Sequence, residues 1–527
     1  MQSSRRIAMN AALMNGFCHQ STNTFSLLRD IESSLNRYGA EHPGMSPQLE
    51  QKCILAISAL LDPDSPKIRQ KKSVAVVGAG ISGLFAGWLL AHAGFHVVVH
   101  EKNGSLDGGR CNTFDFEHQG SKHTIAPGAM RIPDEFTKHL IGRLGLPIKQ
   151  FKNETADSCI IINEGRVLPH IHASRIFNNR LSELWEYELN EIKSQLDSGT
   201  NWIDIVQDKK LHKLTTKQYL LSKGWNESNV ESWLSQGFGL GGYKCWESAM
   251  GGNVAAFEII RDQLMCYPGC VPDEMIGLRD MIDLPQALYE KGRRAGVEFN
   301  FNSTIDFCES ADQRIILIND SKQTFHTDYA IDTAPPKPSS GIHLTTSRKK
   351  FLLVEHNNSE LARFEGKCLM ESEVRQKFAT FGIGELYIQQ VTPNHVIFMG
   401  YSWGSEAKAC ASLSDQLLAD QMYLVLSHTF ENLVALRQFY IKTWKEAFRM
   451  SSIFDEWYPF QGNYDSHFSK GRSIKGIYSA GDWCSPDTGF IRGALAKALH
   501  AAVSIINLSQ SKPASADHLA ANASWAL

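Results

Sequence analysis

The apolar stretch at residues 73–99, SVAVVGAGISGLFAGWLLAHAGFHVVV, constrains the fold of this chain more than any other feature. Its length would let a single helix span a bilayer. However, Gly78, Gly80 and Gly83 form a G-x-G-x-x-G pattern directly after a β-branched run. In a membrane helix these glycines would be incidental, whereas a strand, a tight turn and a helix need each of them. The stretch therefore predicts a strand–turn–helix unit and no transmembrane segment.

Glu101 closes this unit at the end of a second apolar run, HVVVHE. An acidic residue ~20 positions beyond the glycines is typical of dinucleotide-binding folds, where it accepts hydrogen bonds from a ribose. The helix N-terminus after the turn favours an anionic pyrophosphate. A second G-x-G-x-x-G match, at residues 237–242, follows a helical pattern, and we interpret it as a loop.

Length, charge and cysteine content narrow the class of protein. The 527 residues suggest about three structural units. Lys and Arg number 53 against 56 Asp and Glu, which argues against nucleic acid as a partner. Eleven cysteines without a C-x-x-C pair favour a reduced, cytoplasmic protein, with secretion left open. Cys266 and Cys270 are too isolated for a metal site, and we predict no bound metal.

The remaining patterns divide the chain coarsely. Residues 1–70 carry two helical patterns, which we expect to pack on the main body. Helical patterns return at 150–275 and 413–450, whereas 296–332 and 390–403 predict short strands. The small, polar residues at the C-terminus predict a loose tail.

A Gly-Gly-Arg turn at residues 108–110 makes the dinucleotide pattern more specific. GAGISG, then Glu101, then GGR resembles the FAD-binding start of the flavin amine oxidase family. The resemblance implies FAD as the cofactor, with Arg110 near a phosphate; a surface ion pair is the alternative role for Arg110. No cysteine stands at an evident flavin-attachment position, so we expect noncovalent FAD.

PGAMRIP, at residues 127–133, resembles a segment of the L-amino acid oxidases and the amino acid 2-monooxygenases. In those relatives its backbone lies beside the flavin and its arginine clamps the substrate carboxylate. A guanidinium suits that role because its planar fork pairs with a carboxylate at two points. The resemblance assigns the clamp to Arg131, with a structural ion pair as the alternative.

IYSAGDWCSPDTGFIRGALAKALHAA, at residues 477–502, resembles the C-terminal flavin motif of the family. The match implies that Asp482 meets the ribityl chain and that the helix opening at Gly489 points N–H groups at the flavin pyrimidine. A positive helix end would stabilise the anionic reduced flavin. Phe490 stands where many relatives carry Trp, which leaves the substrate side chain open.

Weaker matches complete the resemblance, which spans about residues 72–505. SRKKFL places Lys349 near flavin N5 through a water, with Lys350 as the competing choice. MGYSW places Tyr401 beside the substrate carboxylate, near Trp403. The implied cofactor contacts are Gly78, Gly80, Ile81, Ser82, Gly83, Glu101, Lys102, Gly109, Arg110, Gly128, Ala129, Met130, Arg131, Ile305, Gly481, Asp482, Gly489, Phe490, Ile491 and Ala494. The implied substrate contacts are Arg131, Tyr401, Trp403, Gly489 and Phe490, and Lys349 is the catalytic residue.

The family resemblance implies an α/β fold with a Rossmann-like FAD-binding domain, a mixed-sheet substrate domain and a helical domain. The expected order is an N-terminal helical extension (1–70), FAD-binding segments (72–150, 276–335 and 455–510), a helical domain (151–275), a substrate-binding domain (336–454) and a flexible tail (511–527). A homodimer is implied by the relatives.

The implied activity is that of an L-amino acid oxidase. An L-amino acid would pass a hydride to flavin N5, and oxygen would accept the electrons, giving a 2-oxo acid, ammonia and hydrogen peroxide. The alternatives are a tryptophan 2-monooxygenase-like enzyme that forms the amide, an amine or polyamine oxidase, and a flavin-holding protein that binds a partner without turnover.

Overall fold

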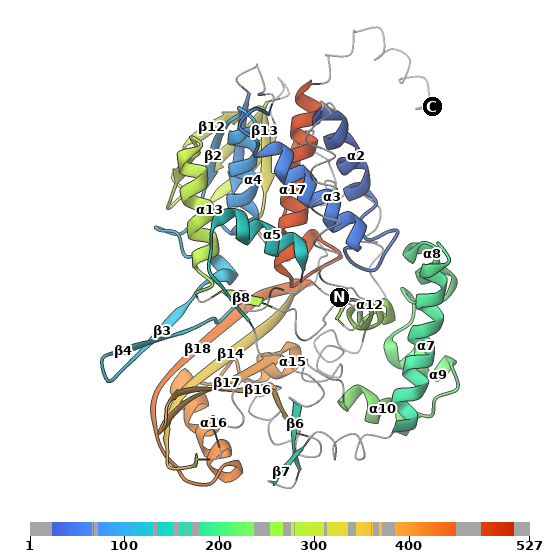
Figure 1. Ribbon diagram of the computed structural model, residues 1–527, viewed down its shortest axis with the longest axis vertical. Coiled ribbons are helices and arrows are strands. Elements are labelled where there is room, and N and C mark those ends of the chain that lie inside the picture. Colours follow the sequence, from blue (N-terminus) through green and yellow to red (C-terminus); the bar gives the residue numbers. More distant parts are fainter. Residues whose placement is uncertain are drawn as a thin grey trace, which may run out of the picture.

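The computed structural model describes three parts of the molecule: an α/β unit, a large sheet and a group of helices (Figure 1). The α/β unit lies at the top of the view, the large sheet at the lower left and the helices at the lower right. The structure describes residues 24–65, 67, 72–129, 132, 134–150, 159–163, 166–169, 179–236, 253–266, 276–278, 280–309, 314–335, 344–359, 361, 368–371, 385–449 and 476–510.

The α/β unit is built on a five-stranded parallel sheet. Its strand order is β19 (Ile477–Ser479), β13 (Tyr329–Asp332), β1 (Ser73–Val77), β2 (His96–His100) and β9 (Glu298–Asn300). Apart from β1 and β2, strands that neighbour one another in space come from segments far apart in the sequence. Buried on both faces, β1 reads as a continuous apolar run rather than an alternating one.

Three helices pack together on this sheet, with α4 between the other two. They are α4 (Ile81–His92), α13 (Asp283–Arg294) and α17 (Ile491–Gln510). The side chains of α4 are buried almost all round, which explains why the helix is apolar on every face. The stretch at 73–99 is therefore strand, helix and strand.

The N-terminal helices pack on the α/β unit, as the sequence predicts. They are α2 (Thr24–Asn36) and α3 (Pro47–Leu60), and they lie against α17 and α5 (Glu135–Leu144) (Figure 1). Leu28, Ile31 and Leu35 of α2 are buried in the same core as α17. Ser46 caps α3 by accepting a hydrogen bond from the Leu49 N–H at 3.2 Å.

The large sheet has seven strands in mixed orientation. Their order is β18 (Leu433–Arg449), β14 (Leu344–His356), β17 (His395–Trp403), β16 (Glu385–Thr392), β15 (Cys368–Glu371), β6 (Cys159–Asn163) and β7 (Arg166–Pro169). One face carries α15 (Gly404–Ala409) and α16 (Asp415–Thr429), and the other carries the hairpin β3 (Phe114–His118) and β4 (Ser121–Ile125).

One helix prediction is wrong in part. Residues 413–450 form α16 and then β18, a 17-residue strand, instead of continuous helix. The segment LVALRQFYIKTWKEAFR is rich in β-branched and aromatic residues, which suit a pleated surface. This segment fits both a helical and a strand pattern, and it forms a strand because it pairs with β14 along almost the whole length of β18. The predicted strands within 390–403 are confirmed by β17 and the end of β16.

The helical group has its own apolar core, around Trp202, Tyr219 and Ile260. Its members are α7 (Asn179–Asp197), α8 (Trp202–Asp208), α9 (Thr216–Ser222), α10 (Glu227–Gln236) and α12 (Ala256–Cys266). The strands β6 and β7, at the start of the predicted helical segment 151–275, pair with the large sheet. Two small sheets remain. One consists of β10 (Ile305–Glu309), β11 (Ile315–Asn319) and β12 (Thr324–Thr327), and the other of β5 (Ile148–Gln150) and β8 (Ile276–Leu278).

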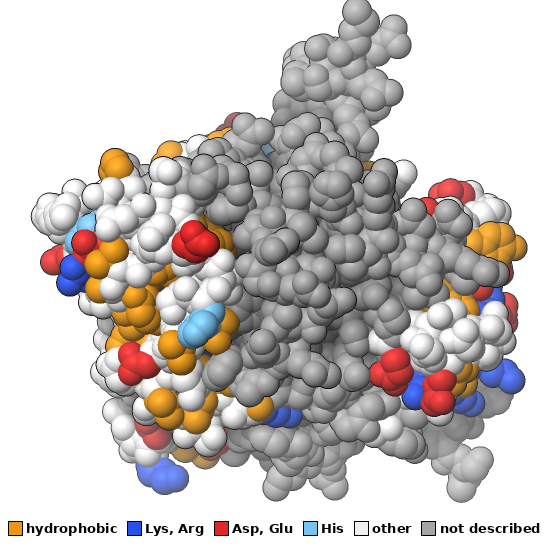
Figure 2. Space-filling view, turned by 90° about the horizontal axis from the view of Figure 1, so that it is seen from below, with side chains coloured by type: hydrophobic (Ala, Val, Ile, Leu, Met, Phe, Trp, Pro, Cys, Tyr) orange, Lys and Arg blue, Asp and Glu red, His pale blue; other side chains and the backbone are white. Residues whose placement is uncertain are grey.

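One helix among the described residues, α17, is long and apolar enough to cross a membrane by length and composition. Within the protein, 78% of its most apolar window is buried. Acidic and basic side chains are interspersed over the described surface seen from below, and hydrophobic side chains gather at its left (Figure 2).

Candidate active site

The glycine turn after β1 is shaped by its three glycines. Gly78 has a φ of +101°, which L side chains rarely adopt, and its N–H donates to the His100 carbonyl at 2.7 Å. A Cβ at Gly83 would lie 2.0 Å from the Gly78 oxygen, so α4 begins directly against the turn. A Cβ at Gly80 would meet nothing within 4 Å, and no side chain caps α4 there. The turn thus presents an uncapped helix N-terminus beside open space.

Glu101 lies at the end of β2, beside the glycine turn. Only 9% of it is exposed, and its two carboxylate oxygens accept from the N–H groups of Ala79 at 2.8 Å and Asn103 at 2.9 Å. These bonds fix the carboxylate at the carboxyl edge of the parallel sheet, where such folds bind dinucleotides. Lys102, the next residue, is exposed.

Arg110 and Asp482 form an ion pair across the site. Both guanidinium NH₂ groups donate to the Asp482 carboxylate, one of them at 2.8 Å, and Asp482 is 3% exposed. Burial disfavours the charged Arg110, but Asp482 outweighs it and raises the arginine pKa. The same carboxylate accepts from the Gly489 N–H at 3.0 Å. Gly109, beside Arg110, has a φ of +57° and open space at its Cβ position.

Lys349 joins the large sheet to the segment that begins PGAM. Its Nζ donates to the Gly128 carbonyl at 2.6 Å and lies 4.5 Å from the ring centre of Tyr401. Lys349 is opposite Tyr401 in the register of β14 and β17, and is 2% exposed. A Cβ at Gly128 would lie 1.8 Å from the Arg110 oxygen, and the Ala129 N–H donates to that oxygen at 2.7 Å. The structure therefore brings these predicted residues together.

The two competing lysines point to opposite faces of the sheet. Lys350 donates to the Ser402 hydroxyl at 2.8 Å and is fully buried. Arg348, on the same face as Lys350, pairs with Asp415 of α16 at 2.7 Å. Because side chains alternate along a strand, only Lys349 can face Gly128. The structure thus shows which of the two lysines lies beside Gly128, a choice that the sequence left open.

The start of α17 lies beside the start of α4. The Ser82 hydroxyl donates to the Ala494 carbonyl at 3.3 Å. Gly489, with a φ of +82°, and Phe490 precede Ile491, the first residue of α17, and Gly481 precedes Asp482 with a φ of +137°. Two predicted cofactor segments, far apart in the sequence, thus converge at one edge of the parallel sheet.

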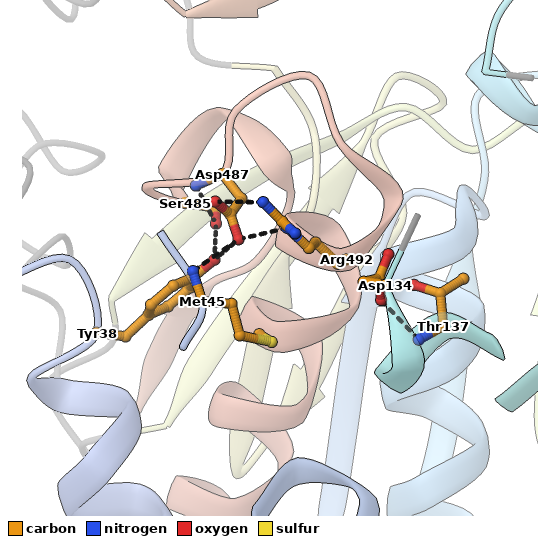
Figure 3. A network of polar contacts seen from close by, with 7 residues as sticks. All are labelled: Tyr38, Met45, Asp134, Thr137, Ser485, Asp487 and Arg492. Atoms are coloured by element: carbon orange, nitrogen blue, oxygen red, sulfur yellow. Dashed lines mark hydrogen bonds and ion pairs between the residues drawn. The ribbon is translucent and has the colours of Figure 1, made fainter. Parts of the chain in front are cut away.

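Four residues in and around the site were not among the site residues that the sequence predicts. Trp444 donates its ring N–H to the Pro127 carbonyl at 3.2 Å, and so holds the segment next to Gly128. Tyr38, Asp487 and Arg492 form a network at the start of α17, and Arg492 belongs to the first turn of that helix (Figure 3). No local pattern marks Tyr38 and Asp487, because they are 449 residues apart.

Some predicted site residues are not among the residues that the structure describes. Met130, Arg131 and residues 237–242 are not among the described residues, nor is the side chain of Trp403. Ile305, one of the implied cofactor contacts, begins β10 and packs against the core that contains Ala75 and Val77 of β1. Within the described part of the chain, no group of three metal-ligating side chains is close enough to hold an ion.

The described site suits a dinucleotide cofactor. An uncapped helix N-terminus, the open position at Gly80 and a buried carboxylate at the end of the second strand are the groups that a pyrophosphate and a ribose require. The class of protein that these features define is a dinucleotide-binding α/β protein.

Comparisons with known proteins identify the family. Residues 81–506 match the model of the flavin containing amine oxidoreductases, and the chain belongs to this family. It is therefore a flavin-dependent oxidoreductase with FAD as its cofactor. It is 41% identical over 95 residues to an L-glutamate oxidase precursor of Streptomyces diastatochromogenes, which covers 17% of this chain and 14% of that protein. It is 29% identical over 171 residues to an L-amino-acid oxidase of Protobothrops flavoviridis, covering 30% and 33%.

Solved structures show the same fold. Cyclohexylamine oxidase from Brevibacterium oxydans superposes with a TM-score of 0.60 at 15% identity, over 84% of this chain and 100% of that one. A redesigned putrescine oxidase superposes with a TM-score of 0.57 at 15% identity, over 83% and 99%. The matched parts of the two curated relatives span a third of their lengths or less.

Proposed function

We propose that this protein is an L-amino acid oxidase. It would convert an L-amino acid, oxygen and water into a 2-oxo acid, ammonia and hydrogen peroxide, with noncovalent FAD. Bound FAD supplies the acceptor for the hydride from the substrate Cα and delivers the two electrons to oxygen. The observation that carries the proposal is the meeting of Lys349, Tyr401 and Gly128 at the segment whose sequence continues to Arg131. The regional similarity to L-amino-acid oxidases supports the same substrate class.

The residues of the chain would orient the substrate. In the proposal, Arg131 and Tyr401 bind the substrate carboxylate, which distinguishes an amino acid from a simple amine. Phe490 would pack against the substrate side chain. Lys349, fixed by the Gly128 carbonyl, would hold a water that accepts a proton from the substrate ammonium group. Most of the rate enhancement would come from this orientation.

Anaerobic mixing with a panel of L-amino acids and amines tests the proposal. Loss of the oxidised-flavin absorbance with amino acids, and not with amines, is the expected result. Bleaching by amines alone would replace the proposal with an amine oxidase, and no bleaching by either class would leave a flavin-holding protein.

Lys349 and Lys350 are adjacent in β14 but point to opposite faces of the sheet, so substitutions of the two lysines form a matched pair. Lys349→Met should slow flavin reduction by about 100-fold, the range of a single proton-transfer contribution. Lys350→Met, which alters the opposite face of the same strand, should change the rate less than threefold once stability is matched. Equal rates for the two variants would contradict the role of Lys349.

An amino acid 2-monooxygenase is the second candidate. The AGD-x-C-S sequence before the helix favours it, and Cys484 and Ser485 in that sequence are both fully buried in the loop. Product analysis separates the two: peroxide with a 2-oxo acid supports the oxidase, and the amide with carbon dioxide supports the monooxygenase.

A further inference from the structure

The turn between α2 and α3 binds the loop that precedes α17. The Tyr38 hydroxyl donates to the Asp487 carboxylate, and the Met45 N–H donates to the same oxygen at 3.3 Å (Figure 3). The Ser485 hydroxyl lies 3.3 Å from the Tyr38 oxygen. Asp487 is fully buried, so these donors replace the water that a carboxylate would otherwise bind.

Asp487 in turn holds the first turn of α17. Arg492 donates from Nε to Asp487 at 2.9 Å, and its guanidinium carbon lies 5.3 Å from the centre of the Phe490 ring. A Cβ at Gly493 would lie 2.2 Å from the backbone carbonyl oxygen of Asp487, which shows how closely the loop packs on the helix. The position of Phe490 is therefore tied to Asp487 through Arg492.

The other end of this loop faces the cofactor site. Asp482 binds Arg110 and the Gly489 N–H, and Ser82 binds Ala494. The loop thus carries two buried carboxylates with different partners. Asp482 joins it to the Gly-Gly-Arg turn, and Asp487 joins it to the N-terminal helices.

The same N-terminal turn also binds the helical group. The Ala40 carbonyl accepts from the Ile203 N–H at 2.9 Å, and the Glu41 carbonyl accepts from the Trp202 N–H at 3.0 Å. Both donors belong to the start of α8. One short turn therefore links the helical group to the loop at the cofactor site.

We propose that the turn at residues 38–45 is a positioning element of the FAD site. Tyr38 and Met45 hold Asp487, Asp487 holds Arg492, and this chain of contacts fixes the start of α17 and Phe490 relative to the flavin. The proposal rests on the proposed function only for the substrate-facing role of Phe490, because FAD follows from the family.

A second tyrosine offers a matched control. Tyr219 donates to the buried Glu188 carboxylate at 2.9 Å, and Lys223 pairs with that carboxylate at 2.9 Å. This phenol–carboxylate–cation group lies within the helical group. Tyr219→Phe should therefore cost a buried hydrogen bond without moving α17.

The experiment compares Tyr38→Phe and Tyr219→Phe holoenzymes. The measurements are the midpoint potential of the bound flavin, the rate of FAD release on dilution read from flavin fluorescence, and the unfolding midpoint in urea. Tyr38→Phe should release FAD about tenfold faster, the loss expected for one buried hydrogen bond. Its flavin potential should fall, because the positive helix end would stabilise the reduced flavin less well.

Tyr219→Phe should show a similar shift of the unfolding midpoint, with an unchanged potential and release rate. The same potential and release rate in both variants would overturn the proposal. If Tyr38→Phe does not fold, Ser485→Ala removes a hydroxyl that accepts from the Asp487 N–H at 3.1 Å. It should lower the potential in the same direction, and an unchanged potential would again overturn the proposal.

Neither flavin readout uses an amino acid. A holoenzyme whose potential responds to Tyr38→Phe but which oxidises no amino acid would contradict the proposed function and support the positioning role. The reverse result would support the function and remove the positioning role.

Discussion

Two groups of the same chemistry occur in different regions of the molecule. Each consists of a tyrosine hydroxyl, a buried carboxylate and a cation. We call them the loop trio (Tyr38, Asp487 and Arg492) and the helical trio (Tyr219, Glu188 and Lys223).

The two trios differ in what they connect and in their access to water. The loop trio joins segments 449 residues apart, and its arginine side chain is 11% exposed. The helical trio joins residues 31 apart, and its lysine is 29% exposed. Burial strengthens an ion pair but makes the loss of one partner costly. Loss of a charged partner should thus lower stability more in the loop trio than in the helical trio.

Removal of the carboxylate charge should give the largest difference. Asp487→Asn leaves Arg492 buried without its partner charge, and should lower the free energy of unfolding by about 3–5 kcal/mol. Glu188→Gln should cost about 1 kcal/mol, because water reaches Lys223. Urea unfolding of both variants measures the difference. Equal losses would show that burial does not distinguish the trios.

A carboxyl group near each trio should give pH effects of opposite sign. Burial, and then the nearby Asp134, raises the pKa of Glu50 from 4.5 to about 7. The contribution of Glu50 to stability therefore falls as the pH rises from about 4.5 to about 7, where the folded protein holds a proton that the unfolded chain has lost. At pH 8, Glu50→Gln should be more stable than wild type by up to about 3 kcal/mol, and this gain should vanish below pH 4.

Glu191, beside the helical trio, is the control for this pH effect. A hydrogen bond from Lys209 lowers the pKa of Glu191, so its stabilising contribution is present at neutral pH and is lost as the pH falls through that lowered pKa. Glu191→Gln should lower stability at pH 8 by well under about 1 kcal/mol, because the side chain is exposed to solvent. Unfolding free energies measured from pH 4 to pH 8 test both. A constant gain for Glu50→Gln over this range would contradict the assignment.

Exchange of the cations should give the smallest effects. Arg492 donates to Asp487 from Nε at 2.9 Å and from a terminal nitrogen at 3.4 Å, so Arg492→Lys loses this two-point pairing and should cost about 1–2 kcal/mol. Lys223→Arg keeps its charge in a partly exposed site and should change stability by less than about 0.5 kcal/mol. Thermal unfolding in low salt is sufficient to detect the difference. A larger effect at Lys223 would reverse the comparison.

The sequence was sufficient to predict elements whose residues are close together in the chain. The strand, glycine turn and helix at 73–92 follow one another along the chain, so their periodicity and glycine spacing were enough. The pair Arg110 and Asp482 could be predicted only as two separate cofactor contacts, because no pattern shows that residues so far apart meet.

Strand register and contacts between distant residues could not be predicted from the sequence. The choice between Lys349 and Lys350 depends on which face of β14 each occupies, and both lie in the same buried run. Residues 433–449 satisfy a helical and a strand pattern, and pairing with β14 decides between them. Tyr38 looks like an ordinary residue at a helix end until the fold places Asp487 beside it.

The packing of α2 on α17 has a consequence for biosynthesis. Glu32 accepts a hydrogen bond from Asn507, 475 residues later, so α2 gains this partner only after residue 507 has left the ribosome. The central sheet likewise gains its strand at 477–479 late. Contacts so distant in sequence form slowly. Until then only α3, among the described helices and strands, covers α2, and the side of α2 that packs on α17 has to be kept from other surfaces. A premature stop before α17 would leave both α2 and α4 without this neighbouring helix.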